Sequence, residues 1–156
     1  MAFSLISEAF THGESIPARF TCDGEDDSPS LKWQGSPDGT QAFALIMDDP
    51  DAPGGTYTHW VIYNIRPQAG GLPEGVEKTD RPANGEGAVQ GSNDFGDNGY
   101  GGPCPPGSNA HHYNFRLYAL DGVVDLASGA SKDDLLKAME GRIVGETTLT
   151  GTYKRR

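Results

Sequence analysis

The sequence predicts one mainly β domain with a single short helix. Its 156 residues suit one hydrophobic core, because single cores usually divide only in considerably longer chains. The 22 glycines and 11 prolines are spread along the chain and indicate many turns, which fits a β-rich domain better than a helical bundle. Several segments also alternate apolar residues with a period of two, as strands do. We therefore expect one domain over residues 1–156, with no internal repeat and no membrane-spanning segment.

The expected strands are short apolar or alternating segments between turn-rich stretches. They cover residues 3–7, 31–33, 42–48, 58–64, 89–91, 113–120 and 147–153. Residues 22–29 and 50–55 are rich in Asp, Gly and Pro, which set turn dihedrals or bond back to their own backbone. Both of these segments are expected to be loops.

One helix is expected after residue 130. Ser131 can cap its start, and Asp133 and Asp134 place acidic side chains in its first turn. Gly141 is expected to end it. Its apolar face contains Leu135, Leu136 and Met139. A face of this kind ordinarily packs on a sheet, so we interpret the helix as scaffold.

Three polar side chains, Asp49, His59 and His111, each stand at the end of an otherwise apolar alternating stripe. The stripes occupy every second position through residues 43–47, 61–65 and 113–119. Because strand side chains alternate between two faces, each polar group shares a face with the apolar residues of its stripe. All three side chains are therefore expected to point inward, at the rim of a β-core.

Two of these strands bring their polar ends together if they pair antiparallel through the turn at residues 50–57. Asp49 then ends one strand where His59 begins the next. An inward carboxylate and imidazole are costly when unpaired, so we expect them to bond to each other, to water or to a ligand. Two ordinary alternatives stay open: Asp49 can cap its turn, and His59 or His111 can be satisfied by a backbone carbonyl.

A loop rich in glycine and proline, residues 93–109, leads directly into His111 and Tyr113. Glycine lets the backbone approach a ligand closely and proline fixes φ, so this loop is expected to be rigid and close-fitting. On composition alone, a long surface connection is the alternative. An anion site would take its donors from imidazoles, the Tyr113 hydroxyl and the N–H groups of the glycine loop, where we place Gly102. A nearby Asp49 would keep one imidazole charged and oriented.

The charge balance narrows the classes of partner. Twelve Lys and Arg residues against 22 Asp and Glu give a formal net charge of −10, which disfavours nucleic acid and anionic membrane surfaces. Backbone N–H groups and imidazoles can still hold an anion locally. The first ten residues lack both a basic segment and a continuous apolar one, so we recognise no secretion signal and expect a cytoplasmic location.

Cys22 and Cys104 are the only cysteines, and their spacing matches neither a CxxC motif nor a zinc site. Because thiols are usually kept reduced in the cytoplasm, two unpaired thiols are the expected state. A disulfide between them stays open, because a long separation in sequence does not exclude proximity in space.

Two kinds of chemistry fit Asp49, His59 and His111. Besides holding an anion, two imidazoles and a carboxylate could bind iron or zinc, so the alternative function is a metal-dependent hydrolase built on these three residues. For nucleophilic catalysis, the chain lacks a Gly-x-Ser-x-Gly elbow, and Cys104 is flanked by prolines without an evident base. We therefore expect a binding protein without a cofactor and not an enzyme.

Several ordered motifs resemble the phosphatidylethanolamine-binding protein (PEBP) family, in its prokaryotic branch of Raf-kinase-inhibitor-like proteins. They are FTCDGEDDSP at 20–29, DDPDAP at 48–53, HW at 59–60, NDFG at 93–96, GYGGPCPP at 99–106, HHY at 111–113 and GTYK at 151–154. The resemblance spans essentially the whole chain.

The resemblance implies a β-sandwich-like fold with Greek-key features and a small pocket that accepts phosphate, acetate or a phosphorylated head group. Carried over motif by motif, Asp49 corresponds to the family's pocket carboxylate, and His59 and His111 to its pocket histidines. Tyr113 corresponds to the pocket tyrosine, and Pro105 and Pro106 to the pocket wall. It further implies a non-catalytic binding and regulatory protein, with a protein kinase or a protease as partner, and a homodimer.

The chain departs from the family pattern at His112. The family's commonest His-Arg-Tyr segment reads His111-His112-Tyr113 here, which removes a permanent positive charge beside the pocket. By parity His112 is expected to face solvent. With a small rim and an acidic chain, a small anion is a better expectation for the ligand than a whole membrane lipid.

Overall fold

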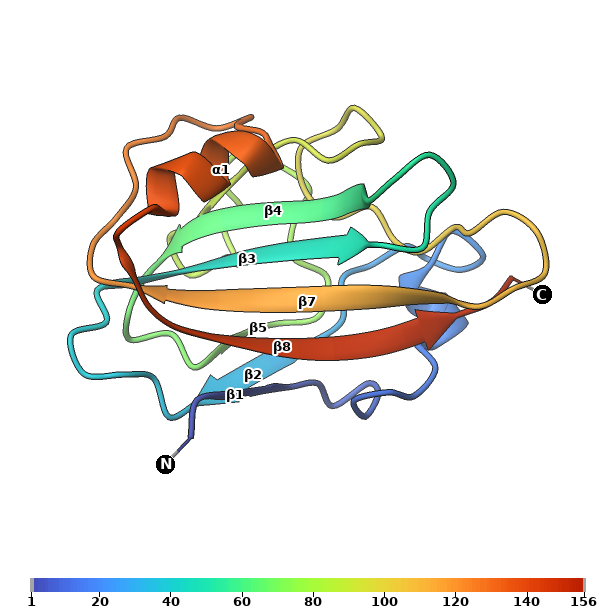
Figure 1. Cartoon of the computed structure of the whole chain (residues 1–156), viewed down its shortest axis with the longest axis horizontal. Helices are drawn as coiled ribbons and strands as arrows, with labels where there is room; N and C mark the ends of the chain where they lie inside the picture. Colours follow the sequence, from blue (N-terminus) through green and yellow to red (C-terminus); the bar gives the residue numbers. More distant parts are fainter. Residues whose placement is uncertain (1, 156) are drawn as a thin grey trace.

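In the computed structural model, which describes residues 2–155, two antiparallel sheets and a short helix make up the fold (Figure 1). The larger sheet has the order β6-β4-β3-β7-β8 and the smaller one β1-β2-β5. The larger sheet contains β3 (Ala42–Asp49), β4 (Tyr57–Ile65), β6 (Val89–Gln90), β7 (His111–Leu120) and β8 (Ile143–Tyr153). The smaller sheet contains β1 (Ser4–Ile6), β2 (Leu31–Gln34) and β5 (Gly71–Leu72). The predicted mainly β class is confirmed.

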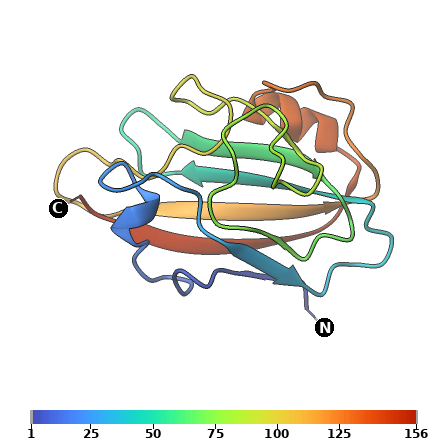
Figure 2. The same cartoon turned by 180° about the vertical axis from the view of Figure 1, so that it is seen from behind.

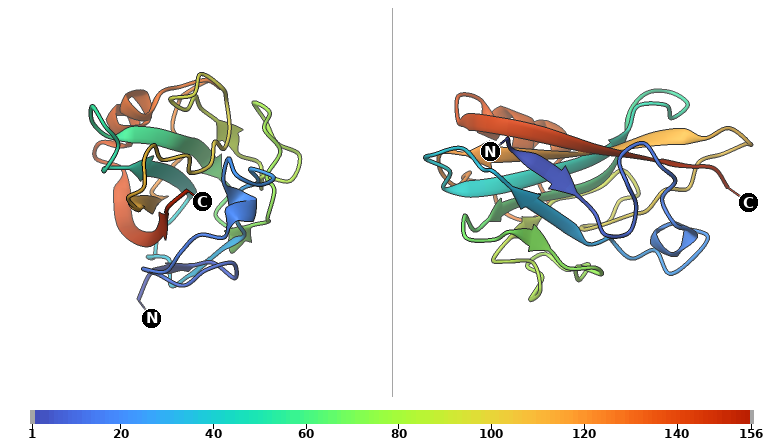
Figure 3. Two further views of the ribbon diagram at one scale, coloured as in Figure 1. Left: turned by 90° about the vertical axis from the view of Figure 1, so that its right-hand side faces the viewer. Right: turned by 90° about the horizontal axis from the view of Figure 1, so that it is seen from below.

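The main core lies between the two sheets. Figure 2 shows the smaller sheet in front of the larger one, and Figure 3 shows the same layers from the end and from below. Apolar side chains of both sheets form one cluster there, including Leu5, Leu31, Trp33 and Leu72 from the smaller sheet and Phe43, Leu45, Met47, Phe115 and Leu117 from the larger. The odd-numbered stripes of β3 and β7 therefore face this core, as their periodicity predicts.

A second, smaller core lies on the opposite face of the larger sheet, under helix α1 (Lys132–Met139) (Figure 1). It contains Ala44, Ile46, Val61, Tyr63, Leu135 and Met139. Strand β3 is consequently buried along its whole length on both faces. A two-sided strand of this kind reads as a continuous apolar run, so alternation alone does not separate its inner face from an outer one.

The start of α1 follows the expected capping pattern. The Ser131 hydroxyl accepts the N–H of Asp134, and the Asp134 carboxylate accepts the N–H of Ser131, which forms a capping box. Gly141 follows the helix with a positive φ of 76°. Leu136 was expected on the apolar face but is 36% exposed, because the contact face consists of Leu135, Ala138 and Met139, spaced three and four residues apart. No helix within residues 2–155 has the length and hydropathy to cross a membrane.

All seven predicted strands are present, with different ends. Strand β5 was not predicted, because a two-residue strand has no measurable period. Strand β8 begins at Ile143, four residues before the predicted start, because its first half is largely exposed and carries no alternating signal. Besides these strands and α1, residues 2–155 contain one short 3-10 helix, η1 (Ala18–Phe20).

The N-terminal segment crosses the outer edge of β8. The N–H groups of Gly13 and Ile16 donate to the carbonyls of Thr150 and Thr152, each at 2.7 Å. Between them, Gly151 faces two buried side chains of this segment. A Cβ at Gly151 would lie 2.6 Å from Ile16 Cγ1 and 2.7 Å from Phe10 Cε2. The absence of a side chain at Gly151 thus lets the segment close over β8.

We predict that Gly151→Ala lowers the free energy of unfolding by about 1–3 kcal/mol, because the added methyl group overpacks this contact. Urea denaturation of both proteins measures the change. Gly70→Ala is the matched control, since a Cβ there meets no atom within 4 Å, and it should stay within about 0.5 kcal/mol of the parent. Equal stability of the two variants would contradict the packing argument.

Candidate functional site

The predicted site residues come from three neighbouring strands that meet at one end of the larger sheet. Strand β3 lies between β4 and β7 and is antiparallel to both, so its last residue, Asp49, lies beside the first residues of the other two. The expected antiparallel pairing of β3 with β4 is confirmed, with Asp49 opposite Tyr57. The topology therefore gathers the ends of the three predicted stripes.

The Asp49 carboxylate is buried and uses both of its oxygens. Oδ2 is 2.7 Å from His111 Nδ1, and Oδ1 accepts the backbone N–H of Asp51 at 2.8 Å. Asp49 thus caps its turn and orients a histidine at the same time. The histidine that bonds to Asp49 is His111. The shared strand end had instead suggested His59 as one possible partner.

His59 is satisfied by the glycine loop instead. Its Nδ1 is 2.7 Å from the carbonyl of Gly101, and the N–H of Gly101 donates to the His59 carbonyl at 2.9 Å. Because a carbonyl only accepts, Nδ1 carries the hydrogen and Nε2 is the free nitrogen of the neutral ring. Burial lowers the pKa of His59 below its ordinary 6.5, although the Gly101 carbonyl and the Asp49 charge oppose this shift.

A bulge explains how His59 reaches this face. Along β4, Val61 and Tyr63 belong to the core under α1, while Trp60 and Ile62 face the core between the sheets. The predicted stripe, in which His59 shares a face with Val61 and Tyr63, is therefore wrong. The β3–β4 register shifts between the pairs Met47–Trp60 and Asp48–Thr58, so His59 is the extra residue. This extra residue reverses the parity and lets the ring contact that of Tyr113, 5.2 Å away between centroids.

Tyr113 carries a polar atom without a partner. Its side chain is fully buried between the rings of His59 and His111. Its hydroxyl is the only buried side-chain nitrogen or oxygen of the described residues that makes no hydrogen bond. Burial and the nearby charges of Asp49 and Asp51 raise the pKa of this phenol far above its ordinary value of 10. The hydroxyl therefore keeps its hydrogen and is a free donor.

A cavity of about 290 Å³ opens over these groups. It is lined by Asp49, Ala52, Pro53, Tyr57, His59, Phe95, Cys104, Pro105, Pro106 and Tyr113. Five of the seven predicted site residues are in this lining, and His111 joins it through Asp49. Sequence reasoning missed Tyr57 and Phe95. Tyr57 could have been found from its position opposite Asp49 in the paired strands, and Phe95 from its place in the NDFG motif.

Gly102 lies outside this cavity. Its N–H donates to Asp26 Oδ1 at 2.8 Å, and a Cβ there would lie 2.4 Å from both that oxygen and the carbonyl of Phe20. The N–H groups of Gly101 and Gly102 are both used within the protein, so neither is the free anion donor that the glycine loop was expected to supply. The free donors come from side chains.

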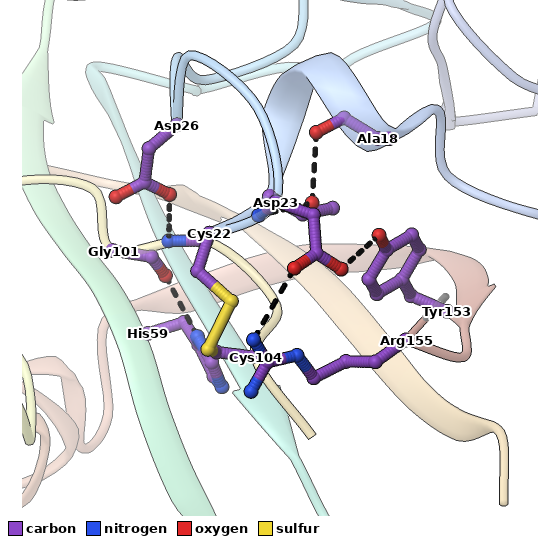
Figure 4. The surroundings of a disulfide bond; sticks show 11 residues. Ala18, Cys22, Asp23, Asp26, His59, Gly101, Cys104, Tyr153 and Arg155 are labelled. Carbon is purple, nitrogen blue, oxygen red and sulfur yellow. Dashed lines mark hydrogen bonds and ion pairs between the residues drawn. A yellow bond between two sulfur atoms is a disulfide. The ribbon is translucent and has the colours of Figure 1, made fainter. Parts of the chain in front are cut away.

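Cys22 and Cys104 form a disulfide, with their Cα atoms 5.4 Å apart (Figure 4). The expectation of two unpaired thiols is therefore wrong. The fold brings the loop after η1 against the glycine loop, although the two cysteines are 82 residues apart in sequence. The bond lies beside the Gly101–His59 pair (Figure 4).

His112 is exposed, as its parity predicts. Its backbone N–H and its Nδ1 both contact Asp51 Oδ2, at 2.8 and 2.7 Å. These two hydrogen bonds lower the pKa of Asp51 below its ordinary 3.8. His112 thus fastens the turn after β3 and takes no part in the cavity lining.

The residues of the metal alternative lie at one strand end but do not converge on a common point. Asp49 and His111 are bonded directly to each other, and His59 Nδ1 is directed at a carbonyl. Within residues 2–155, no group of three or more His, Cys, Asp or Glu side chains is arranged to hold a metal ion. The cavity instead presents a phenol hydroxyl and an imidazole nitrogen, framed by proline and aromatic side chains.

Comparisons with known proteins agree over nearly the whole chain. The family model described as phosphatidylethanolamine-binding protein matches residues 6–154. A UPF0098 protein of Methanothermobacter thermautotrophicus is 54% identical over 152 residues, covering 97% of this chain and 99% of that protein. Two crystal structures superpose with a TM-score of 0.90 each. One is a PEBP homologue from Chlamydia trachomatis, 38% identical with 99% of both chains covered, and the other is YbcL of Escherichia coli, 34% identical with 100% of both chains covered.

The resemblance inferred from the motifs is thus confirmed by an independent family match, by close relatives and by solved structures with the same fold. This chain belongs to the phosphatidylethanolamine-binding protein family.

Proposed function

We propose that this chain is a non-catalytic binding protein whose cavity at the end of β3, β4 and β7 takes a small anion, such as phosphate or a phosphorylated group. The observation that carries the proposal is the unpaired Tyr113 hydroxyl. A buried hydroxyl without a partner costs about 1–3 kcal/mol. A ligand oxygen that accepts its hydrogen would recover this cost, so the free protein is prepared for an acceptor.

His59 favours an anion over a neutral acceptor. Its Nε2 is the ring nitrogen left free by the bond to Gly101, and protonation would make it a charged donor beside Tyr113. In the free protein burial disfavours this charge. An anion in the cavity would stabilise the imidazolium, so anion binding and proton uptake should be coupled.

A binding role fits the lining better than a catalytic one. The Tyr113 phenol resists ionisation, the oxygens of Asp49 are both bonded, and the sulfur of Cys104 is bonded in the disulfide. None of these three groups is a free nucleophile. Phe95, 45% exposed at the cavity edge, offers an apolar surface through which an occupied pocket could contact a protein partner. We propose that ligand-dependent contact with a protein kinase or a protease is the regulatory output.

Tyr113→Phe separates binding from stability. We expect this variant to bind phosphate about tenfold to a hundredfold more weakly, since a hydrogen bond to a charged group contributes about 1.5–3 kcal/mol. Its free energy of unfolding should stay equal or rise by about 1 kcal/mol, because an unsatisfied hydroxyl is removed. Calorimetric titration and urea denaturation measure the two effects.

The matched control for this prediction is Tyr100→Phe. The Tyr100 hydroxyl is also buried, but it donates to the Phe20 carbonyl at 2.7 Å and lies outside the 290 Å³ cavity. This variant should lose about 1 kcal/mol of stability and keep its phosphate affinity. If Tyr113→Phe bound phosphate as tightly as the parent, the proposed site would be wrong.

The pKa of His59 should rise when phosphate binds. NMR titration of the ring is expected to give a pKa below 6.5 in the free protein and a higher one in millimolar phosphate. Sulfate, whose charge stays constant over this range, is the control for titration of phosphate itself. A His59 pKa that is the same with and without both anions would refute anion binding at this imidazole.

The free protein should become less stable as the pH is lowered, and part of this loss should depend on His59. Because burial lowers the folded pKa below 6.5, the unfolded chain binds more protons below that pH, so stability is retained above pH 6.5 and lost as the pH falls through the folded pKa. For one proton the slope is at most about 1.4 kcal/mol per pH unit. Urea denaturation between about pH 7 and about pH 5 should show a shallower decline for His59→Gln, and parallel declines would contradict the assignment.

A further inference from the structure

The Cys22 side of the disulfide is firmly held. Cys22 follows η1, and the neighbouring Asp23 accepts hydrogen bonds from the Tyr153 hydroxyl at 2.6 Å and from Arg155 at 3.3 Å (Figure 4). Thr21 is fully buried and its hydroxyl donates to the Ala18 carbonyl. The loop that carries Cys22 is therefore fixed to η1 and to the end of β8.

On the Cys104 side, a wall of the 290 Å³ cavity is formed by Cys104, Pro105 and Pro106. A second cavity, of about 790 Å³, adjoins it. Cys104 and Phe95 line both. The residues just before Cys104 are buried, whereas residues 106–110 are exposed, so packing decreases beyond the disulfide and the direct bonds of this stretch become important.

The hydrogen bonds of this stretch end just before the disulfide. Before Cys104, the Pro103 carbonyl accepts the N–H of Cys22 at 3.1 Å, and Gly102 is bonded to Asp26. Beyond it, the backbone of residues 105–110 makes no hydrogen bond to the described part of the chain until β7 begins. Two of these residues, Pro105 and Pro106, line the anion cavity. Within the described residues, the disulfide is thus the last covalent or hydrogen-bonded attachment of this wall before β7.

The wall also positions the imidazole of the proposed site. The Gly101 carbonyl that holds His59 Nδ1 lies three residues before Cys104, on the same stretch of loop (Figure 4). A shift of this stretch would change the orientation of His59 as well as the shape of the cavity. Cys22, in contrast, lies outside the lining of this cavity.

The disulfide is open to reduction from the Cys22 side, since Cys22 is exposed and Cys104 is half-buried. A thiolate of a dithiol reductant can attack Cys22 Sγ, which breaks the S–S bond, forms a mixed disulfide and releases Cys104 as a thiolate that takes up a proton. The second thiol of the reductant then displaces Cys22. The products are two protein thiols and the oxidised reductant, so two electrons and two protons are transferred.

We propose that the Cys22–Cys104 disulfide is a redox-sensitive anchor of the pocket wall, so that its reduction lowers the affinity of the cavity for anions. The proposal rests on the anion-binding function proposed above. Release of the wall reduces the fraction of molecules with a formed pocket, and the affinity falls in proportion.

The test compares phosphate affinity in the oxidised protein and in protein reduced with dithiothreitol, which is then removed without oxygen. We expect the dissociation constant for phosphate to rise about fivefold or more on reduction, as when only a fifth of the molecules keep a formed pocket. A Cys22→Ser, Cys104→Ser double variant should bind like the reduced protein and should not respond to dithiothreitol. Amide hydrogen exchange in β3 and β7 reports whether the rest of the fold is retained.

Each outcome decides the proposal. Weaker binding with unchanged protection of β3 and β7 supports it, and equal affinity in the two redox states overturns it. Loss of protection throughout both strands on reduction also overturns it, since the disulfide would then stabilise the whole fold and not the wall. If the oxidised protein binds no phosphate, the anion-binding function is wrong. The NMR signals of His59 then decide the redox coupling: a change on reduction supports it and no change refutes it.

Discussion

The structure depends on two adjacent carboxylates at the end of a strand that is buried on both faces. Asp48 is 0% exposed and Asp49 is 3% exposed, and they point to opposite sides of β3. A buried charge is tolerated only with partners, so each side of the sheet must supply them. Arg116 and Lys132 bind Asp48 at 3.1 and 2.9 Å, and His111 binds Asp49. The start of α1 and the start of β7 are thereby both fixed to the end of one strand.

The parts of the fold that could be predicted from sequence are those with a long local pattern. Strands β3, β4 and β7 were found because their apolar periods are long, and α1 because Ser131 and Asp134 form a local capping pattern. Two cores on either side of β3 were not predicted. Ala44 and Ile46 are apolar, but nothing in the sequence assigns the cover of their face to a helix almost 90 residues later.

The site shows the same division between local and long-range information. The inward directions of Asp49, His111 and Tyr113 follow from strand parity, and parity placed them correctly. His59 lies on the expected face for a different reason, because a bulge in β4 reverses the alternation there. Which histidine bonds Asp49, how Gly102 is used and whether Cys22 meets Cys104 all depend on how distant loops pack, which no local pattern encodes.

The resulting pocket combines a rigid floor with a lightly attached wall. Asp49, His59 and Tyr113 project from paired strands, which fix their backbone positions, although the ring of His59 is oriented by the Gly101 carbonyl. Pro105 and Pro106 lie on a segment fixed mainly through Cys104, so the wall depends on a covalent bond that redox conditions control. Disulfides persist in oxidising compartments and are usually kept reduced in the cytosol. The compartment in which the protein resides therefore sets the resting state of the wall and, through the Gly101 carbonyl, the orientation of the His59 ring, while Tyr113 depends only on its strand.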